Sequence, residues 1–412
     1  MRILIVSQYF WPENFRINDL TAELVRRGHS VTVLTGCPNY PEGVVQPGFL
    51  ANPRQFDEFA GARVVRIPMT PRGKGALRLM LNYLTFACSA TVLGVWRLRQ
   101  EKFDAIFGFG ASPIMSILPA VVLRRTKRSP LLLWVLDLWP ESLSAVGVVK
   151  SQRVLGWVGK FVSFIYRRCD LILAQSKAFT PSIAQYAGNA ADRIRYFPGW
   201  AEGVFRDSPV ACAPAVELSS HGDAFKILFA GNVGEAQDLP SVLDAAEELK
   251  FRPDILWFIV GDGRGAPYVR QEIARRGLQN RVLMLGRFPL DRMPSFFAAA
   301  DALLVTLKGD PIISRTIPGK IQSYMGMGVP LLGMLDGEGA RVIEESKGGL
   351  VSPASDGKGL ARNAAALVSM STMQRAEMGR RARAYGSREF NRDTLIDALE
   401  NHISEVIEHN HL

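Results

Sequence analysis

One lysine and four glycines have the types and spacing to hold a phosphorylated ligand. Lys320 follows a proline-glycine pair at the expected start of a helix, where its ammonium and the helix dipole would attract the same anion. Gly231 and Gly234 bracket a turn between an apolar run and a helical pattern, and Gly261 and Gly263 follow the next apolar run. Glycine lets the backbone approach a ligand closely. The pattern predicts a diphosphate clamp, with a ligand-free turn and a surface lysine as the alternatives.

Two further residues would complete this clamp. Arg287 follows a third apolar run, and Ser323 lies one turn after Lys320. Ser323 and the adjacent Tyr324 are on the first turns of the same helix, within reach of a ribose or base. Because parallel strands end at one edge of a sheet, these loops should form the rim of a nucleotide pocket. The sequence has no Asp-x-Asp pair that would suggest a divalent metal. We therefore expect the helix dipole and Lys320 to hold the diphosphate without a metal.

A second group of candidate residues lies in the first half of the chain. Asp137 follows the apolar run 131–136, where a carboxylate could act as a base or bind a hydroxyl; a helix N-cap is an equally good interpretation. The loops after the first two apolar runs should face the same cleft. They contribute Trp11, Glu13, Asn14, Arg16, Asn39 and Tyr40.

The elements that must position these residues form two α/β halves. A chain of 412 residues predicts two domains of about 150 to 200 residues each. Apolar runs too continuous to alternate, as in strands covered on both faces, alternate with helical patterns in both halves. Residues 201–224 have no periodicity and contain glycine and proline, so we expect a linker there. The second domain should begin at Phe225.

The net charge of +10 is unevenly distributed. Residues 1–200 hold 25 Lys and Arg against 12 Asp and Glu, a net of +13, whereas residues 201–412 hold 24 against 27, a net of −3. Such a field suits nucleic acid, acidic lipid headgroups or a pyrophosphate-bearing substrate, with a solvated basic face as the alternative. We do not expect a nucleic-acid partner, because the basic residues are scattered over several elements.

Residues 76–96 form the most apolar stretch. It has no charge from position 79 to 96, which just reaches the lower length limit for a membrane span. A buried or groove-lining helix is the favoured interpretation, ahead of shallow membrane contact and of a span. The polar residues that weaken a span are Asn82, Thr85, Ser89 and Thr91, and the basic flanks that suit an interfacial helix are Lys74, Arg78, Arg97 and Arg99.

The cysteines and the N-terminus indicate a cytoplasmic location. Four cysteines at wide spacings predict neither a disulfide framework nor a zinc site. The N-terminus has one charge and a five-residue apolar run, which is too short for a signal peptide. A reducing compartment fits both features.

Six motifs carry a resemblance to a known family. The sequence resembles family 4 glycosyltransferases over essentially its whole length. It is most similar to the bacterial fucosaminyl (N-acetyl-L-fucosamine) transferases of O-antigen and capsule assembly. The motifs are SQYFWPENFRINDL at 7–20, GCPNYPEG at 36–43, VLDLWPESL at 135–143, FAGNVGEAQDL at 229–239, VGDG at 260–263 and PGKIQSYMGMGVP at 318–330.

This resemblance implies a fold and a reaction. It implies a GT-B architecture of two Rossmann-like domains facing across a cleft, with an acceptor domain at 1–200 and a donor domain at 225–387. Residues 388–412 should cross back onto the first domain. The implied reaction is retaining transfer, without metal or cofactor, from a UDP-sugar to a lipid-linked (polyprenyl diphosphate) saccharide. It would occur at the inner face of the cytoplasmic membrane.

The chain departs from the family pattern at two places. Many members have two glutamates eight positions apart in the segment 315–323, and this chain has neither; the second usually contacts the ribose, so Ser323 is a weaker substitute. Gln237 stands where many relatives have a lysine, and Arg315 could add charge. The expected catalytic residues are Lys320, Asp137 and Glu13. The expected donor-binding residues are Gly231, Asn232, Gly234, Gln237, Gly261, Gly263, Arg287, Arg315, Lys320 and Ser323.

Two other functions remain open from the sequence. A UDP-HexNAc 2-epimerase or hydrolase of the same fold would need no lipid acceptor. A non-catalytic nucleotide-binding module would need no catalytic residue at all.

Overall fold

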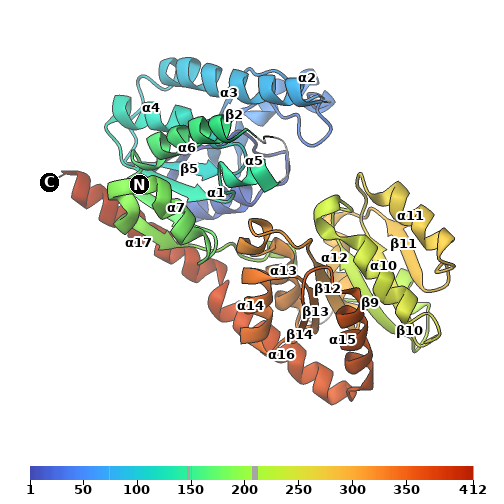
Figure 1. Ribbon diagram of the computed structural model, residues 1–412. Coiled ribbons are helices and arrows are strands. Elements are labelled where there is room, and N and C mark those ends of the chain that lie inside the picture. The colour runs from blue at the N-terminus through green and yellow to red at the C-terminus, as the bar shows by residue number, and fades with distance from the viewer. Residues whose placement is uncertain (74, 146–148, 150, 207–211, 412) are drawn as a thin grey trace. The chain divides into compact units, whose positions relative to one another are not determined.

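The chain forms two compact units in the computed structural model (Figure 1). Unit 1 comprises Met1–Pro198 and Asp393–Leu412, and unit 2 comprises Gly199–Arg392. The structure describes residues 1–73, 75–145, 149, 151–206 and 212–411. Lys74, expected to flank the apolar helix, lies outside these residues, as do positions 207–211 of the expected linker.

Unit 1 is built on an eight-stranded sheet of order β3-β4-β2-β1-β5-β6-β7-β8. The strands pair in parallel, except that β3 is antiparallel to β4. Continuous apolar runs form the central strands because both faces of the sheet are covered. The strands are β1 (Arg2–Val6), β2 (Ser30–Gly36), β3 (Glu58–Phe59), β4 (Ala62–Ile67), β5 (Ala105–Gly110), β6 (Leu131–Val135), β7 (Leu171–Ala174) and β8 (Ile194–Tyr196).

The helices of unit 1 cover the two faces of this sheet. The core under α3, α4, α6 and α7 is one continuous cluster that includes Phe86, Leu123, Val162 and Ile183. The helices are α1 (Arg16–Arg26), α2 (Pro47–Ala51), α3 (Ala76–Arg97), α4 (Leu118–Lys127), α5 (Glu141–Ala145), α6 (Gln152–Tyr166), α7 (Phe179–Ala187) and the C-terminal α17 (Arg392–His411).

Unit 2 is built on a six-stranded parallel sheet of order β11-β10-β9-β12-β13-β14. Two apolar clusters, one on each face, form its core. Its strands are β9 (Phe225–Ala230), β10 (Ile255–Val260), β11 (Val282–Gly286), β12 (Ala302–Thr306), β13 (Leu331–Met334) and β14 (Gly349–Ser352). Its helices are α8 (Gly203–Arg206), α9 (Val216–Ser219), α10 (Leu239–Glu248), α11 (Ala266–Arg275), α12 (Met293–Ala298), α13 (Gly319–Met327), α14 (Gly337–Ser346), α15 (Gly357–Ser369) and α16 (Thr372–Glu389).

Each sheet reverses its strand order at one point. In unit 1 the reversal lies between β1 and β5, and in unit 2 it lies between β9 and β12. Ligands of open α/β sheets bind beyond the carboxyl ends of the strands at such a point. The loops after β1 and β9 are therefore the first places to look for a site.

Part of the segment expected as a linker packs onto unit 2. Leu218 in α9 is fully buried in one of the two cores of this unit. Ala215 N donates a hydrogen bond of 2.9 Å to Ser295 O. The described residues 212–224 are thus held by unit 2 along their length.

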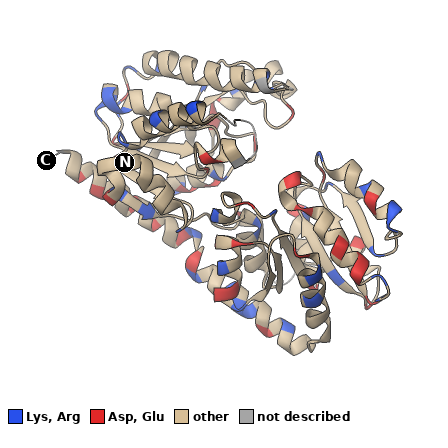
Figure 2. Cartoon of the chain, in the orientation of Figure 1, with Lys and Arg blue, Asp and Glu red and all other residues tan. Residues whose placement is uncertain are grey.

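The charge difference between the units is smaller than that between the two halves of the sequence. The five acidic residues of 393–412 belong to unit 1, so unit 1 has 25 basic and 17 acidic residues, a net of +8. Unit 2 has 24 and 22, a net of +2. Within unit 1, Arg27 forms ion pairs with Asp397 and with Glu400 of α17, the latter at 2.6 Å. The acidic stretch of α17 is visible in Figure 2.

Helix α3 is only partly buried, whereas a buried or groove-lining helix was the favoured interpretation. Phe86 and Ala90 are fully buried, but Leu77, Val92 and Trp96 are exposed. One face of α3 thus packs on unit 1, and an apolar face points outward.

Candidate active site

A pocket of about 530 Å³ lies at the carboxyl edge of the sheet of unit 2. It opens where the strand order reverses, beside the end of β9. Loops after β9, β10 and β11 form one side, and the start of α13 forms another. Its lining comprises Glu202, Phe205, Ala230, Gly231, Asn232, Val260, Gly261, Asp262, Arg287, Phe288, Leu290, Met293, Phe297, Gly319, Lys320, Ser323 and Tyr324.

Lys320 places an enclosed ammonium group in this pocket. Within the described chain, its Nζ is inaccessible to solvent and has no hydrogen-bond partner. Nζ lies 3.6 Å from the centre of the Phe229 ring, a contact that offsets part of the cost of burying the charge. Burial lowers the pKa of Lys320 to about 7. An anion entering the pocket would supply the partner that this cation lacks.

Glycine at position 231 makes room for the lysine. A Cβ atom at Gly231 would lie 3.0 Å from Lys320 Cε and 3.1 Å from Nζ, and its φ of +143° disfavours other residues. A Cβ atom at Gly261 would lie 1.8 Å from Gly231 O. Backbone bonds tie the same loops together, since Gly231 N donates to Val260 O at 2.9 Å and Gly261 N to Gly286 O at 2.7 Å. The loops approach each other too closely for side chains at these glycines.

Tyr324 fixes the position of α13 relative to β9. Its hydroxyl accepts a hydrogen bond of 3.0 Å from Ala230 N and donates one of 3.2 Å to Ala230 O. The sequence suggested that Tyr324 could reach a ribose or base, but its hydroxyl is already bound to the backbone. Tyr324 is therefore a positioning residue that holds Lys320 beside Gly231.

Glu202 is a pocket residue that the sequence analysis missed. Ser323 Oγ donates a hydrogen bond of 2.7 Å to Glu202 Oε2. The pocket thus has a carboxylate beside Ser323, although the family-pattern glutamates in 315–323 are absent. Glu202 lies in the segment interpreted as a linker, and no motif marks it, so its spatial proximity to Ser323 could not be seen in the sequence.

The pocket gathers six of the ten expected donor-binding residues, namely Gly231, Asn232, Gly261, Arg287, Lys320 and Ser323. The other four, Gly234, Gln237, Gly263 and Arg315, are not among its lining residues. Gln237 Oε1 accepts a bond of 3.2 Å from Gly234 N, so this pair stabilises its own turn. A Cβ atom at Gly263 would lie 2.4 Å from Val233 O, which explains glycine there as close loop packing.

Of the two helix starts expected to hold the anion, α13 borders the pocket. The turn after β9 continues as a short 3₁₀ helix, Glu235–Gln237, before α10 begins at Leu239. Neither Leu239 nor Pro240 lines the pocket. The extra turn moves the start of α10 away, and the β9 loop contributes through Gly231 and Asn232 instead.

In unit 1, Glu13 is a brace between two loops. It is 4% exposed, and its carboxylate accepts backbone N–H bonds from Phe10 at 3.1 Å and from Asn39 and Tyr40 at 2.6 Å each. Burial raises the pKa of Glu13 to about 7, against the lowering effect of these bonds. Glu13 was expected to be catalytic, but the bonds occupy the carboxylate, so we assign it a positioning role.

Other expected acceptor-side residues are also held within the loops. Asn39 is 1% exposed, and its Oδ1 accepts a bond of 2.8 Å from Arg72 N. The Trp11 ring packs on Phe56, and the backbone N–H of Trp11 donates to Asn18 Oδ1 at 3.1 Å. Asn14 is exposed in the β1 loop, and Arg16 is the first residue of α1.

Asp137 remains accessible at the carboxyl end of β6. Its carboxylate accepts hydrogen bonds from the Ser142 hydroxyl and from Trp139 Nε1, the latter at 3.2 Å. An N-cap carboxylate would accept a hydrogen bond from a backbone N–H of the helix. Both donors to Asp137 are side chains, so the described contacts do not show it as an N-cap. Tyr83 of α3, which the sequence analysis missed, interacts electrostatically with Asp137, and burial raises the pKa of Tyr83.

Tyr40 and Arg72 lie on the same edge of unit 1. The Arg72 guanidinium lies over the Tyr40 ring, 5.2 Å from its centre. Arg72 follows the β4 strand and carries no motif, so only the fold relates it to Tyr40. Together with Tyr83 and Asp137, these two residues are the polar candidates for contact with an acceptor in unit 1.

No group of three or more His, Cys, Asp or Glu residues that could hold a metal occurs in the part of the chain that was searched. The expectation that the diphosphate is held without a metal stays a prediction.

Comparison with known proteins defines the enzyme class. Residues 14–200 match the model of the glycosyl transferase 4-like domain, and residues 224–370 match that of glycosyl transferases group 1. The protein is a glycosyltransferase of the GT-B fold. This assignment excludes the alternative that the chain is a non-catalytic nucleotide-binding module.

Curated relatives of the glycosyltransferase are bacterial. It is 27% identical over 344 residues to the putative colanic acid biosynthesis glycosyl transferase WcaI of Escherichia coli K12, covering 80% of this chain and 82% of the relative. It is 26% identical over 268 residues to the probable glycosyltransferase WbjE of Pseudomonas aeruginosa, covering 64% and 66%.

Solved structures share the fold of the glycosyltransferase over its full length. Anabaena HepE in complex with UDP and glucose aligns with a TM-score of 0.71 and 19% identity, covering 98% of this chain and 100% of HepE. WaaG, a glycosyltransferase involved in lipopolysaccharide biosynthesis, aligns with a TM-score of 0.63 and 14% identity, covering 98% and 99%. At these identities the likeness establishes the GT-B fold.

Proposed function

We propose that this glycosyltransferase moves a sugar from a UDP-sugar to a lipid-linked saccharide during bacterial surface polysaccharide assembly. The main support for a UDP-sugar donor is the Lys320 ammonium at the start of α13, which has no hydrogen-bond partner within the described chain. It lies in a pocket that is also lined by the backbone of Gly231 and Gly261. The name of WcaI, a putative colanic acid biosynthesis enzyme, supports the setting, and the UDP complex of HepE supports the nucleotide.

The pocket residues suit the parts of a UDP-sugar. Lys320 and the exposed Arg287 are its cations, so they are the candidates for the diphosphate. The Glu202 carboxylate, with Ser323 beside it, can accept hydrogen bonds from the ribose hydroxyls. Phe205, Phe288, Leu290, Met293 and Phe297 provide an apolar wall for the uracil ring.

The proposed reaction breaks the bond between the sugar C1 and the β-phosphate oxygen. Negative charge then develops on the departing UDP, where the Lys320 ammonium and the N–H groups at the start of α13 can stabilise it. The acceptor hydroxyl oxygen forms the new bond to C1, and its proton passes to the β-phosphate oxygen of the departing UDP. Asp137 is our candidate for binding that hydroxyl in unit 1. The proposed retention of configuration and independence of metal follow from the family resemblance.

The finer assignments come from the resemblance of the motifs. We propose an N-acetylated deoxyhexosamine such as N-acetylfucosamine as the sugar, and a polyprenyl diphosphate saccharide as the acceptor. Such an acceptor is held in a membrane, so the enzyme would work as a peripheral protein at the cytoplasmic face. The motif GCPNYPEG at 36–43 is the narrowest basis for this subgroup.

A donor screen tests the proposal. Purified protein is mixed with a panel of UDP-sugars and a bacterial lipid extract, and UDP release and the mass of the extended lipid are measured. We expect one UDP-HexNAc to give both signals, and both to depend on lipid. UDP release or an epimerised sugar without lipid would instead select the 2-epimerase or hydrolase alternative.

A further inference from the structure

Helix α3 carries its polar side chains on the face that contacts the rest of unit 1. Asn82 Nδ2 donates to Thr70 O at 2.7 Å, and Ser89 Oγ donates to Pro68 O at 2.7 Å. Thr85 Oγ1 accepts from Thr70 N at 3.0 Å. These polar residues weakened the prediction of a membrane span, and in the structure they bond within unit 1. They also tie α3 to unit 1, so that it is not free to leave as a span.

The outward face of α3 is apolar along the helix. Leu77, Met80, Leu84, Val92 and Trp96 lie on it, with Leu77 73% and Val92 66% exposed. Among the residues searched, 77–97 is the helix long and apolar enough to cross a membrane by length and composition, and 28% of its most apolar window is buried. That fraction is too small for a core helix. Figure 2 shows the ribbon of α3 uncharged over nearly all of its length.

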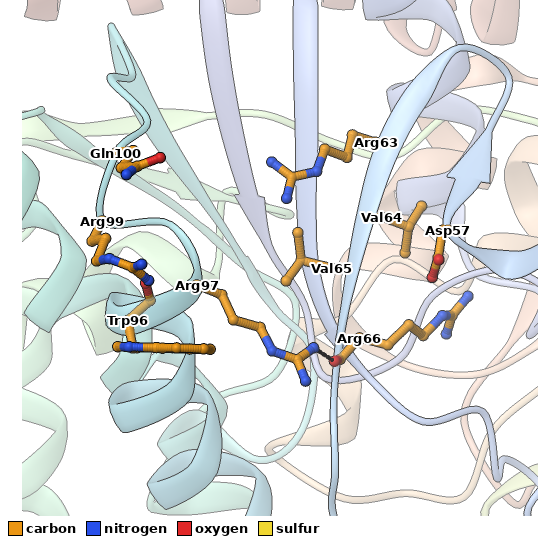
Figure 3. A pocket seen from close by; sticks show the side chains of 9 residues that line it. All are labelled: Asp57, Arg63, Val64, Val65, Arg66, Trp96, Arg97, Arg99 and Gln100. Carbon is orange, nitrogen blue, oxygen red and sulfur yellow. Dashed lines mark hydrogen bonds between the residues drawn. The ribbon is translucent and has the colours of Figure 1, made fainter. Parts of the chain in front are cut away.

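A pocket of about 490 Å³ lies at the C-terminal end of this apolar face (Figure 3). Arg63 reaches it from β4, Arg97 from the last turn of α3, and Arg99 from the loop that follows. Arg97 donates a hydrogen bond to Arg66 O at the edge of β4. The Arg99 guanidinium lies 4.9 Å from the centre of the Trp96 ring. Cationic groups therefore adjoin the exposed indole.

Most of this positive charge is not neutralised within the protein. Arg63 pairs with Glu101. Within the described chain, Arg78, Arg97 and Arg99 have no carboxylate oxygen within 4.0 Å. The sequence has no acidic residue from position 59 to 100. The pocket also includes the carboxylate of Asp57. Its net charge is still positive, because the arginines outnumber this carboxylate.

We propose that unit 1 docks on an anionic phospholipid bilayer through the outward face of α3. The apolar side chains would enter the interface between headgroups and acyl chains, and the arginine pocket would hold a headgroup phosphate. Basic residues at both ends of an uncharged apolar strip are complementary to such a bilayer, in which anionic headgroups lie above the acyl chains. The inference deepens the proposed function, because a docked enzyme would meet a lipid-linked acceptor.

Vesicle co-sedimentation tests the docking surface. The full-length protein is mixed with vesicles of phosphatidylcholine alone or with phosphatidylglycerol, and the bound fraction is measured. An apolar-face variant combines Met80→Ser, Leu84→Ser and Val92→Ser, and an arginine variant combines Arg97→Gln with Arg99→Gln. The matched control is Phe251→Ser in unit 2, where the side chain is 84% exposed. Circular dichroism and UDP affinity report folding of every variant.

We expect wild type and the control to bind anionic vesicles alike. The apolar-face variant should partition onto vesicles about tenfold or more weakly than wild type. The arginine variant should partition about fivefold more weakly per removed charge, and only onto the vesicles that contain phosphatidylglycerol. Lys320→Met should bind vesicles normally, which separates docking from the donor site. The proposal is overturned if wild type does not bind the vesicles, or if Phe251→Ser reduces binding as much as the α3 variants do. It is also overturned if Trp157→Ser on α6 reduces vesicle binding while the α3 variants bind like wild type.

Discussion

At the scale of single residues, the account depends on how Lys320 is held. Its ammonium is enclosed beside the Phe229 ring, and no side chain of the described chain neutralises it. An ammonium in such a site stabilises a bound anion strongly, because there is little water to screen the charge. The sequence located the lysine but not its surroundings, since the ring and the bare Gly231 backbone come from another part of unit 2.

Gly231→Ala should weaken UDP binding by about tenfold or more, because the new methyl group would displace Lys320 and the backbone conformation would be strained. Isothermal titration with UDP measures this. Gly277→Ala is the matched control, because Gly277 also has a positive φ, of +68°, but open space around it. Equal UDP affinities of wild type and Gly231→Ala would argue against close contact between lysine and ligand.

Glu202→Gln should reduce the preference for a ribose donor. A hydrogen bond to a charged group contributes about 1.5–3 kcal/mol, so the variant should bind UDP about ten- to a hundredfold more weakly and distinguish UDP less well from 2′-deoxy-UDP. Ser323→Ala, which removes the neighbouring hydroxyl, should give a smaller loss. If Glu202→Gln discriminates against the deoxy compound as well as wild type does, the ribose assignment is wrong.

At the scale of elements, most strands could be predicted and most loop functions could not. The run 255–260 is apolar throughout, and the run 225–230 is apolar except for Lys226, because both faces of the sheet are covered; both runs are strands. The four-residue β14 and the two-residue β3 were missed, since neither has a long apolar run. Helix α3 was located within one residue, but an outward apolar face belonged only to the less favoured interpretation of an interfacial helix, because periodicity does not say which side is covered.

The loop residues show why site roles were harder to predict than strands. Glu13 looked like a catalytic carboxylate because it follows a strand in unit 1. It proves to accept three backbone bonds that join the β1 and β2 loops. Conversely, Glu202 and Tyr83 carry no motif, and their roles follow from neighbours distant in the sequence. Only the three-dimensional contacts distinguish a brace from an accessible group.

Glu13→Gln should destabilise unit 1 by about 1–3 kcal/mol. The amide NH₂ group cannot accept hydrogen bonds, so at least one buried N–H of the loops would lose its partner. Chemical denaturation measures the change, and UDP affinity should stay at the wild-type value because the donor pocket lies in unit 2. Unchanged stability would mean that the carboxylate is not the brace we describe.

At the scale of the whole molecule, the chain returns to unit 1 at its C-terminus. Ile396, Leu399 and Ile403 of α17 are fully buried. Five acidic residues arrive with this helix, which lowers the net charge of unit 1 to +8. The family resemblance predicts that residues 388–412 cross back onto the first domain, whereas the effect of this segment on the charge balance is seen only in the structure.

Leu399→Ala should destabilise the protein by about 2–5 kcal/mol, because it leaves a cavity under α17. Thermal unfolding measures the loss, and the exposed Ser404→Ala on the same helix is the control. UDP binding should be retained in both variants. A negligible effect of Leu399→Ala would indicate that α17 is not part of the core of unit 1.

The most direct test of the account is a UDP titration that measures proton uptake. Burial holds the pKa of Lys320 near 7, whereas a bound diphosphate must raise it, so binding at pH 8 should take up close to one proton. Affinity should fall by up to about tenfold per pH unit as the pH rises above about 7. Titration in buffers of different ionisation enthalpy gives the uptake, with Lys320→Met as the reference for protons taken up by UDP itself. Uptake that disappears in Lys320→Met, together with weaker but still measurable UDP affinity, is the predicted result. Equal uptake and equal affinity in the two proteins would contradict the account.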